Sequence, residues 1–250
     1  MNGPRPIHRA APRVVSLVPS LTETLLAWGV HPVAVTRFCE VDGYPTVGGT
    51  KNPDIDAIVA LRPDVVLMDR EENRLPDATA LRTAGLRVLD VHVRSLDDVA
   101  KALEEVAASV GRTAPPSVGR TAPASPPPVA AGPGRLPRRI PVWVPIWRRP
   151  WMTIGSGTYG TSILAAAGFD NVYSDSDAYP TVELDDVRSR RPELVLAPSE
   201  PYPFKERHRE ELEEVAPVLF VDGKDLFWWG SRTAAAAERL SRLAASLQRG

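Results

Sequence analysis

The sequence is poor in cysteine, in net charge and in long apolar runs, and each shortage excludes a class of protein. Cys39 is the only cysteine among 250 residues, so no disulfide can form within the chain. Lys and Arg (30) nearly balance Asp and Glu (31), and the formal net charge of -1 gives no support for binding nucleic acid or an anionic membrane. No apolar run approaches the roughly 20 residues of a membrane-spanning helix. We therefore expect no nucleic-acid partner and no membrane span.

Export signals and enzyme motifs are also missing. The first 20 residues contain no apolar core of about 7 to 15 residues and no lipid-accepting cysteine after one. As written, the sequence predicts a cytoplasmic protein with a disordered leader at residues 1–12. Nucleophile-elbow, P-loop and HExxH motifs are absent, so we do not expect an enzyme.

The sequence does contain one phrase that occurs twice. Residues 54–68 read DIDAIVALRPDVVLM, and residues 183–197 read ELDDVRSRRPELVLA. In both copies a short helix is expected to end at the proline of an Arg-Pro pair, after which a Val/Leu run starts a buried strand. Neighbouring segments recur at a similar offset. The pattern predicts two lobes that arose by duplication of one α/β unit.

The N-terminal lobe is expected to span residues 13–95. Ser20 and Glu23 form a capping box that predicts a helix start, and Asn52-Pro53 is expected to cap the first repeated helix. Alternating strands and helices predict a parallel sheet flanked by helices. The strands of this sheet are predicted at 13–18, 32–36, 64–68 and 86–91.

The C-terminal lobe is expected to span residues 140–250 and to repeat this α/β arrangement. Its elements are predicted as a strand at 140–147, a helix ending at 167, the repeated helix and strand at 183–197, a helix at 203–215, a strand at 218–222 and a helix from 231. Residues 96–139 connect the lobes, as a helix of about four turns followed by a Pro/Ala-rich linker.

Ligands of open parallel sheets bind beyond the carboxyl ends of the strands. In the first lobe the residues at these ends are mostly polar and include Asp69 and Arg70. In the second lobe aromatic residues such as Trp151, Tyr202 and Trp228 dominate. Aromatic walls with a few polar groups are typical of a pocket for a large, flat, partly apolar ligand. Two further tryptophans, Trp143 and Trp147, lie within a predicted strand and are better explained as core residues.

Several segments together resemble the substrate-binding proteins of ABC importers for vitamin B12 and iron complexes. The resemblance covers almost the whole chain except the linker and is carried by RVVSLVPSLTETLLAWG, NPDIDAIVALRPDVVLM, PELVLAPSEPYPF and VDGKDLFWWG. The cobalamin-binding branch is the most similar. The resemblance implies a monomeric receptor with a helical backbone between two α/β lobes, which holds cobalamin, a related corrinoid or another metal chelate between the lobes and delivers it to an ABC permease.

The same resemblance implies ligand-binding positions. The aromatic of the first-lobe rim falls on Phe38, whereas two further tryptophan positions fall on Thr50 and Asp69 and depart from the family pattern. In the second lobe the matching positions are Trp151, Tyr179 and Asp225. Together with residues at the strand ends, the predicted ligand-binding set is Ser20, Phe38, Thr50, Asp69, Arg70, Trp151, Tyr179, Tyr202, Asp225, Trp228 and Trp229.

Members of the family also dock to the permease through an acidic side chain on each lobe. The acidic residues in the matching neighbourhoods are Glu71, Glu72, Asp77, Glu206 and Glu210. A solvated helix face explains each of these residues equally well. No single docking residue is assigned.

Two rival ligand classes stay open. A zinc- or iron-ion binding protein of the same fold would draw on Cys39, His92 and His208, although no two of these share a diagnostic spacing. A literal G-x-G-x-x-G at Gly155, Gly157 and Gly160 matches the fingerprint of NAD- or FAD-binding oxidoreductases. That fingerprint requires a buried strand running straight into the first glycine, and the preceding proline leaves only a short approach.

Overall fold

A computed structural model describes residues 11–113 and 138–249 of the chain. Most of the predicted leader and nearly all of the Pro/Ala-rich linker lie outside these residues. The described chain divides into an N-terminal unit, residues 11–92 and 102–113, and a C-terminal unit, residues 93–101 and 138–249. Helix α4 (Leu96–Ser109) contributes residues to both.

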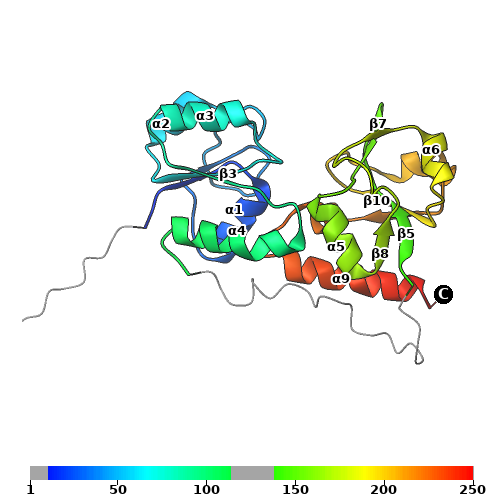
Figure 1. Ribbon diagram of the computed structural model, residues 1–250. Coiled ribbons are helices and arrows are strands. Elements are labelled where there is room, and N and C mark those ends of the chain that lie inside the picture. Colours follow the sequence, from blue (N-terminus) through cyan, green and yellow to red (C-terminus); the bar gives the residue numbers. More distant parts are fainter. Residues whose placement is uncertain (1–10, 114–137, 250) are drawn as a thin grey trace, which may run out of the picture. The chain divides into compact units, whose positions relative to one another are not determined.

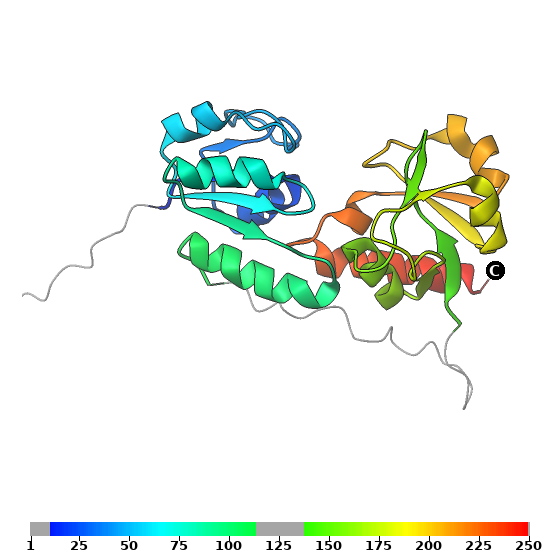
Figure 2. The same ribbon diagram turned by 45° about the horizontal axis from the view of Figure 1, so that its top comes forward.

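The N-terminal unit is built on a four-stranded parallel sheet in the order β2-β1-β3-β4. Helices cover both faces of this sheet, so all five residues of its inner strand β3 are buried. The strands are β1 (Val14–Ser16), β2 (Ala34–Val35), β3 (Val65–Asp69) and β4 (Val88–Val91). Helices α2 (Ile55–Leu61) and α3 (Leu75–Thr83) lie over one face, and α1 (Pro19–Ala27) and α4 lie over the other (Figures 1 and 2).

The C-terminal unit contains two sheets. The first is parallel, in the order β11-β10-β5-β8, and consists of β5 (Ile140–Trp143), β8 (Phe169–Asn171), β10 (Leu194–Pro198) and β11 (Val218–Val221). The second is antiparallel and consists of β6 (Pro145–Trp147), β7 (Trp151–Thr153) and β9 (Thr181–Val182). Its helices are α5 (Tyr159–Ala167), α6 (Leu184–Ser189), the 3-10 helix η1 (Glu206–His208), α7 (Arg209–Glu213), α8 (Lys224–Phe227) and α9 (Thr233–Leu247).

The repeated phrase folds in the same way in both units. Helices α2 and α6 are each followed by an arginine with positive φ, 45° at Arg62 and 54° at Arg191, and then by a proline. Few residues other than glycine adopt this conformation, and the prolines prevent the helices from continuing. The strands β3 and β10 begin two residues after the prolines. The predicted unit of helix, Pro and strand is confirmed in both copies.

Two predicted helix caps were wrong. Helix α1 begins at Pro19 and is preceded by Val18, with no side-chain cap, because proline is favoured at the first helical position. The capping box expected at Ser20 is therefore not formed. Helix α2 is capped by Asp54, whose carboxylate accepts a 3.0 Å hydrogen bond from the backbone N–H of Ala57, and not by Asn52-Pro53.

Other differences lie in the C-terminal unit. The strand expected at 140–147 breaks at Val144 and joins two different sheets, as β5 and β6. The helix expected at 203–215 is shortened to η1 and α7, because the backbone at Lys205 is extended and Phe204 before it is buried in the core. Strands β8 and β9 and helix α8 were not predicted. Their lengths of two to four residues are too short to carry a hydrophobic period.

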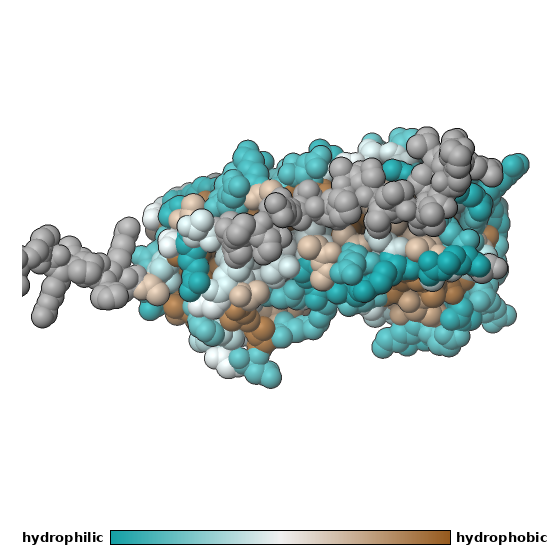
Figure 3. Space-filling view, turned by 90° about the horizontal axis from the view of Figure 1, so that it is seen from below, coloured by the Kyte–Doolittle hydropathy of each residue, from teal (hydrophilic) through white to brown (hydrophobic). Residues whose placement is uncertain are grey.

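Within residues 11–113 and 138–249, none of the helices combines the length and the apolarity that crossing a bilayer requires. Hydrophilic surface interrupted by separate apolar patches makes up the face shown in Figure 3. Separate patches of this kind are ordinary for a globular protein.

Candidate ligand-binding surfaces

A buried asparagine joins three loops at the carboxyl ends of the N-terminal strands. The Asn73 side chain donates from Nδ2 to the carbonyl oxygens of Thr50 (2.8 Å) and Leu17 (3.3 Å). Its Oδ1 accepts from the backbone N–H of Asp69 at 3.0 Å. Two predicted ligand-binding positions, Thr50 and Asp69, are therefore brought together by a residue that the sequence gave no reason to select.

The other predicted positions of this unit differ in exposure. Asp69 is buried and accepts a 2.8 Å hydrogen bond from the backbone N–H of Glu71, so its carboxylate shapes the loop. Arg70 is exposed and pairs with Asp90 at 3.2 Å. Ser20 is buried in the first turn of α1. Their contacts with a ligand stay predictions.

Phe38 is the exposed aromatic of this rim. Half of its side chain is exposed (51%), and the guanidinium carbon of Arg37 lies 4.9 Å from its ring centroid. His92, which follows β4, and Glu71, which follows β3, contact each other: His92 Nε2 lies 2.9 Å from Glu71 Oε1. Lys51 Nζ also donates a hydrogen bond to the carbonyl oxygen of Glu71. Charged groups thus populate the strand ends of the N-terminal unit, as its sequence suggested.

The C-terminal unit instead carries a chain of aromatic contacts, which we call the aromatic row. Neighbouring ring centroids in it are 4.7 to 6.1 Å apart. The row begins in the core and ends on the surface, in the order Trp143, Trp151, Phe204, Tyr202 and Trp147. Trp143 is fully buried, as expected, whereas Trp147 is 46% exposed and so is not the core residue that was predicted. Trp147 is the last residue of β6, and the pairing of β6 with β7 shifts its register between Pro145 and Trp147.

His208 packs against two rings of the aromatic row. Its ring centroid lies 5.6 Å from that of Tyr202 and 5.7 Å from that of Phe204. The Nδ1 atom accepts a 3.0 Å hydrogen bond from the backbone N–H of Lys205. Burial, followed by the positive charge of Arg207, lowers the pKa of His208 below its ordinary value. The imidazole therefore stays neutral and serves as a packing element of the row.

The segment around α8 contributes one partly exposed indole. The ring centroid of Trp228 lies 4.6 Å from Lys224 Nζ and 5.3 Å from the guanidinium carbon of Arg232. Trp229 is buried, and so is Asp225, whose carboxylate accepts hydrogen bonds of 2.7 and 2.5 Å from Arg239. Asp225, Trp228 and Trp229 were all predicted to bind ligand. Among them only Trp228 is partly exposed, and two cationic side chains lie next to its ring.

Tyr179 lies on the loop between β8 and β9 and is 42% exposed. This loop runs against the segment that follows β7. The backbone N–H of Gly155 donates to the Ala178 carbonyl at 2.7 Å, and that of Ser156 donates to the Ser176 carbonyl at 3.0 Å. Tyr179 is thus presented by a loop whose main chain is fixed just before it.

Two of the three glycines of the G-x-G-x-x-G motif have a structural reason that involves no ligand. A Cβ atom at Gly155 would lie 1.8 Å from the backbone carbonyl oxygen of Asp177, and Gly157 has a positive φ of 60°, which other residues rarely adopt. The strand before the motif, β7, pairs only with antiparallel neighbours among the described strands. A dinucleotide fingerprint needs a parallel strand that leads into the first glycine. The geometry therefore contradicts the NAD or FAD interpretation.

The three candidate metal ligands have separate surroundings. Cys39 is buried, with its Sγ 3.2 Å from Thr22 Oγ1, while His92 contacts Glu71 and His208 backs the aromatic row. In the part of the chain that the structure describes, no group of three or more His, Cys, Asp or Glu side chains is placed to hold a metal ion.

Comparison with known proteins shows which families and folds this chain resembles. A family model described as "Periplasmic binding protein" matches residues 14–115. The vitamin B12-binding protein of Salmonella paratyphi A is 29% identical over 197 residues, which are 75% of this chain and 72% of that protein. The chain is thus similar to the periplasmic binding protein family over its N-terminal part and to vitamin B12-binding proteins over three quarters of its length. Its resemblance to substrate-binding proteins of ABC importers is thereby confirmed.

Solved structures of similar fold support the predicted architecture. The periplasmic vitamin B12 binding protein BtuF of Vibrio cholerae is 20% identical, with a TM-score of 0.74 over 96% of this chain and 99% of that one. The periplasmic heme-binding protein BhuT is 21% identical, with a TM-score of 0.76 over 94% of this chain and 98% of that one. These likenesses confirm the predicted fold of two α/β lobes.

The similarity to this family bears on two expectations from the sequence. The matching family and the similar proteins are non-enzymatic components of transport, in line with the expectation that this chain is not an enzyme. The family is also periplasmic by description, which leaves the expected cytoplasmic location without support.

Proposed function

We propose that this binding protein holds cobalamin or a related corrinoid or metal chelate outside the cytoplasmic membrane and delivers it, as a monomer, to an ABC importer. The observation that carries the proposal is the aromatic row of the C-terminal unit, which runs from buried Trp143 to exposed Trp147. Rings of this kind stack on flat macrocycles. Support also comes from the relative named as a vitamin B12-binding protein and the fold neighbour named as heme-binding.

The affinity expected for a chelate ligand indicates how many aromatic rings and polar groups must contact it. Covering about 100 Å² of apolar ring surface contributes roughly 2.5 kcal/mol. A dissociation constant of about 1 μM corresponds to about 8 kcal/mol, before the costs of association are counted. One aromatic ring is therefore not enough. Tyr202, Trp228 and Tyr179 have to act together with polar contacts.

Positive charge near Trp228 fits the periphery of these ligands. Lys224 and Arg232 both lie close to this indole, so a ligand that stacks there would meet two cationic side chains. Corrinoids carry a phosphate and porphyrins carry carboxylates at their edges. Charge-assisted hydrogen bonds to such groups are about twice as strong as neutral ones. The arrangement favours a large chelate with an anionic edge.

A bare metal ion is the weaker alternative. Zinc and iron ions need several nitrogen, sulfur or oxygen ligands that converge on one point. The described residues offer no such convergence. The permease-docking residues stay unassigned: Asp77, for example, is buried and already engaged by Arg74 through both carboxylate oxygens.

The proposal is tested by titration with a panel of ligands. The purified protein is titrated with cyanocobalamin, haemin, a ferric siderophore, zinc and NAD while tryptophan fluorescence is followed. We expect quenching by cyanocobalamin or another of the chelates and no response to zinc or NAD. Quenching by NAD or zinc alone would contradict the proposal.

Two variants connect the binding to the predicted positions. Trp228→Ala and Tyr179→Ala remove exposed or partly exposed rings, and each should weaken chelate binding about tenfold, which is about 1.4 kcal/mol. Leu247→Ala removes an exposed apolar side chain from the last residue of α9 and should leave the affinity unchanged. Equal effects of all three variants would contradict the assignment of the site.

A further inference from the structure

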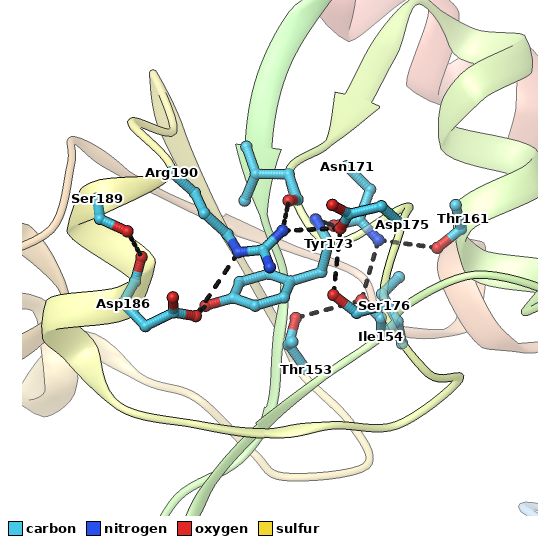
Figure 4. Close-up of polar contacts among 11 residues, drawn as sticks. Thr153, Ile154, Thr161, Asn171, Tyr173, Asp175, Ser176, Asp186, Ser189 and Arg190 are labelled. Carbon is cyan, nitrogen blue, oxygen red and sulfur yellow. Dashed lines mark hydrogen bonds and ion pairs between the residues drawn. The ribbon is translucent and has the colours of Figure 1, made fainter.

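Arg190 fastens the loop that carries Tyr179, defined here as the Tyr179 loop, residues 172–180. Its Nη1 donates to the carbonyl oxygen of Val172 and to Oδ1 of Asp175, both at 2.7 Å. Its guanidinium carbon also lies 4.2 Å from the ring centroid of Tyr173. One side chain at the end of α6 thus contacts three residues of the loop (Figure 4).

Tyr173 adds a further contact between α6 and the Tyr179 loop; we call the contacts of Arg190 and Tyr173 together the clamp. It is only 2% exposed, and its hydroxyl donates a 2.6 Å hydrogen bond to Oδ2 of Asp186 on α6. Burial, followed by the hydrogen bond to Asp186, raises the pKa of the phenol far above its ordinary value. The hydroxyl therefore remains protonated and keeps donating. Figure 4 shows the ring of Tyr173 lying between Asp186 and the polar side chains around Asn171.

The duplicated phrase shows what is particular to this clamp. In the alignment of residues 54–68 with residues 183–197, Arg190 stands where the first copy has Leu61. Both residues precede the Arg-Pro pair that ends the helix. The unit with charged strand ends has an apolar residue at this position. The unit with the aromatic row has the arginine.

We propose that Arg190 is a positioning residue for ligand binding, which acts by holding Tyr179 in its binding orientation. This inference rests on the proposed function. Fixing a residue of a free loop costs roughly 1 to 2 kcal/mol, and an anchored loop has met this cost before the ligand arrives. Arginine suits the role because its planar group donates in several directions while it stacks on a ring.

A double-mutant cycle tests the proposal. Arg190→Gln is compared with Arg188→Gln, a substitution on the same helix whose guanidinium contacts Asp185 and Glu214 instead of the Tyr179 loop. Both are made with and without Tyr179→Ala, and the dissociation constant is measured for the chelate that binds most tightly.

We expect Arg190→Gln to weaken binding about tenfold in the natural sequence and less than about twofold beside Tyr179→Ala. Arg188→Gln should change the affinity in neither background. If Arg190→Gln weakens binding equally in both backgrounds, it acts by general destabilisation, and the proposal is wrong. An unchanged affinity in the natural sequence would also overturn it.

A second measurement needs no ligand and separates this proposal from the proposed function. The amides of Gly155 and Ser156 donate to the Tyr179 loop, so their hydrogen exchange reports how firmly the loop is held. Arg190→Gln should accelerate both amides several-fold more than Arg188→Gln does. If the natural protein binds no chelate, the proposed function fails. Unaltered exchange in Arg190→Gln overturns the clamp in either case.

Discussion

The Nδ2 atom of Asn73 donates a hydrogen bond to the carbonyl oxygen of Thr50 at 2.8 Å. The C-terminal unit has a matching arrangement, in which Asn171 Nδ2 donates to the Ile154 carbonyl at 2.9 Å and to Thr161 Oγ1 at 2.8 Å. Both asparagines are buried. In each unit an amide side chain satisfies loop carbonyls that would otherwise be buried without partners. The candidate surfaces are therefore built on fixed loops.

Removal of the Asn73 amide should destabilise the N-terminal unit. Asn73→Ala deletes three hydrogen bonds and leaves buried backbone groups unsatisfied, so we expect the free energy of unfolding to fall by about 2 to 4 kcal/mol. Urea denaturation measures this change. Asn52→Ala is the matched control: its amide is exposed and accepts one long hydrogen bond of 3.4 Å from Arg37, so a loss of about 0.5 kcal/mol is expected. Equal losses in the two variants would refute the role of Asn73.

Gly155 tests the packing explanation of the glycine motif. Its φ does not require glycine, but a Cβ atom would overlap the backbone of Asp177, which has no flexible end that could move away. We expect Gly155→Ala to lower the free energy of unfolding by about 2 kcal/mol or more. The neighbouring exposed residue serves as the control, and Ser156→Ala should cost less than about 0.5 kcal/mol. A Gly155→Ala variant as stable as the natural protein would show that the two loops are not packed as described.

His208 makes stability depend on pH. Burial and the cations of Arg207, Arg148 and Lys205 lower its pKa below 6.5, and only Glu211 opposes them. Below about pH 6.5 the unfolded chain therefore binds more protons at this residue than the native state does. The contribution of His208 to stability is complete above that pH and is lost as the pH falls through the native pKa.

The substitution His208→Asn checks this prediction. Asn offers Oδ1 in place of Nδ1 to the N–H of Lys205 but does not titrate. We expect urea midpoints of the variant to fall less steeply than those of the natural protein between about pH 7 and pH 5. His31→Gln removes a histidine of the N-terminal unit and should leave the steep fall in place. Identical pH profiles for His208→Asn and the natural protein would contradict the prediction.

The fold could be predicted largely because the repeated phrase combines two strong signals. Pro63 and Pro192 end helices by removing a backbone donor, and the Val/Leu runs after them are long enough to identify as buried strands. The antiparallel sheet of the C-terminal unit escaped prediction for the opposite reason. Strand β9 has two residues and β7 has three, so neither shows a period that a sequence pattern can detect.

The candidate site could be predicted only where exposure follows from position along a strand or loop. Tyr179 and Trp228 are exposed or partly exposed as a loop position suggests, whereas Trp229, the next residue after Trp228, is buried. Asn73 and Arg190 both donate to carbonyl oxygens of loops that lie well apart from them in sequence. Their residue types are common on surfaces, so nothing in the sequence singled them out.

The central claim is that this chain binds a corrinoid or a related metal chelate, and isothermal titration calorimetry on the natural protein tests it most directly. Cyanocobalamin, haemin and a ferric siderophore are titrated separately, with zinc and NAD as comparison ligands. The account predicts one site per chain for at least one chelate, with a dissociation constant of about 1 μM or below and a negative heat-capacity change from burial of apolar rings. Binding of zinc or NAD with no binding of any chelate would contradict it.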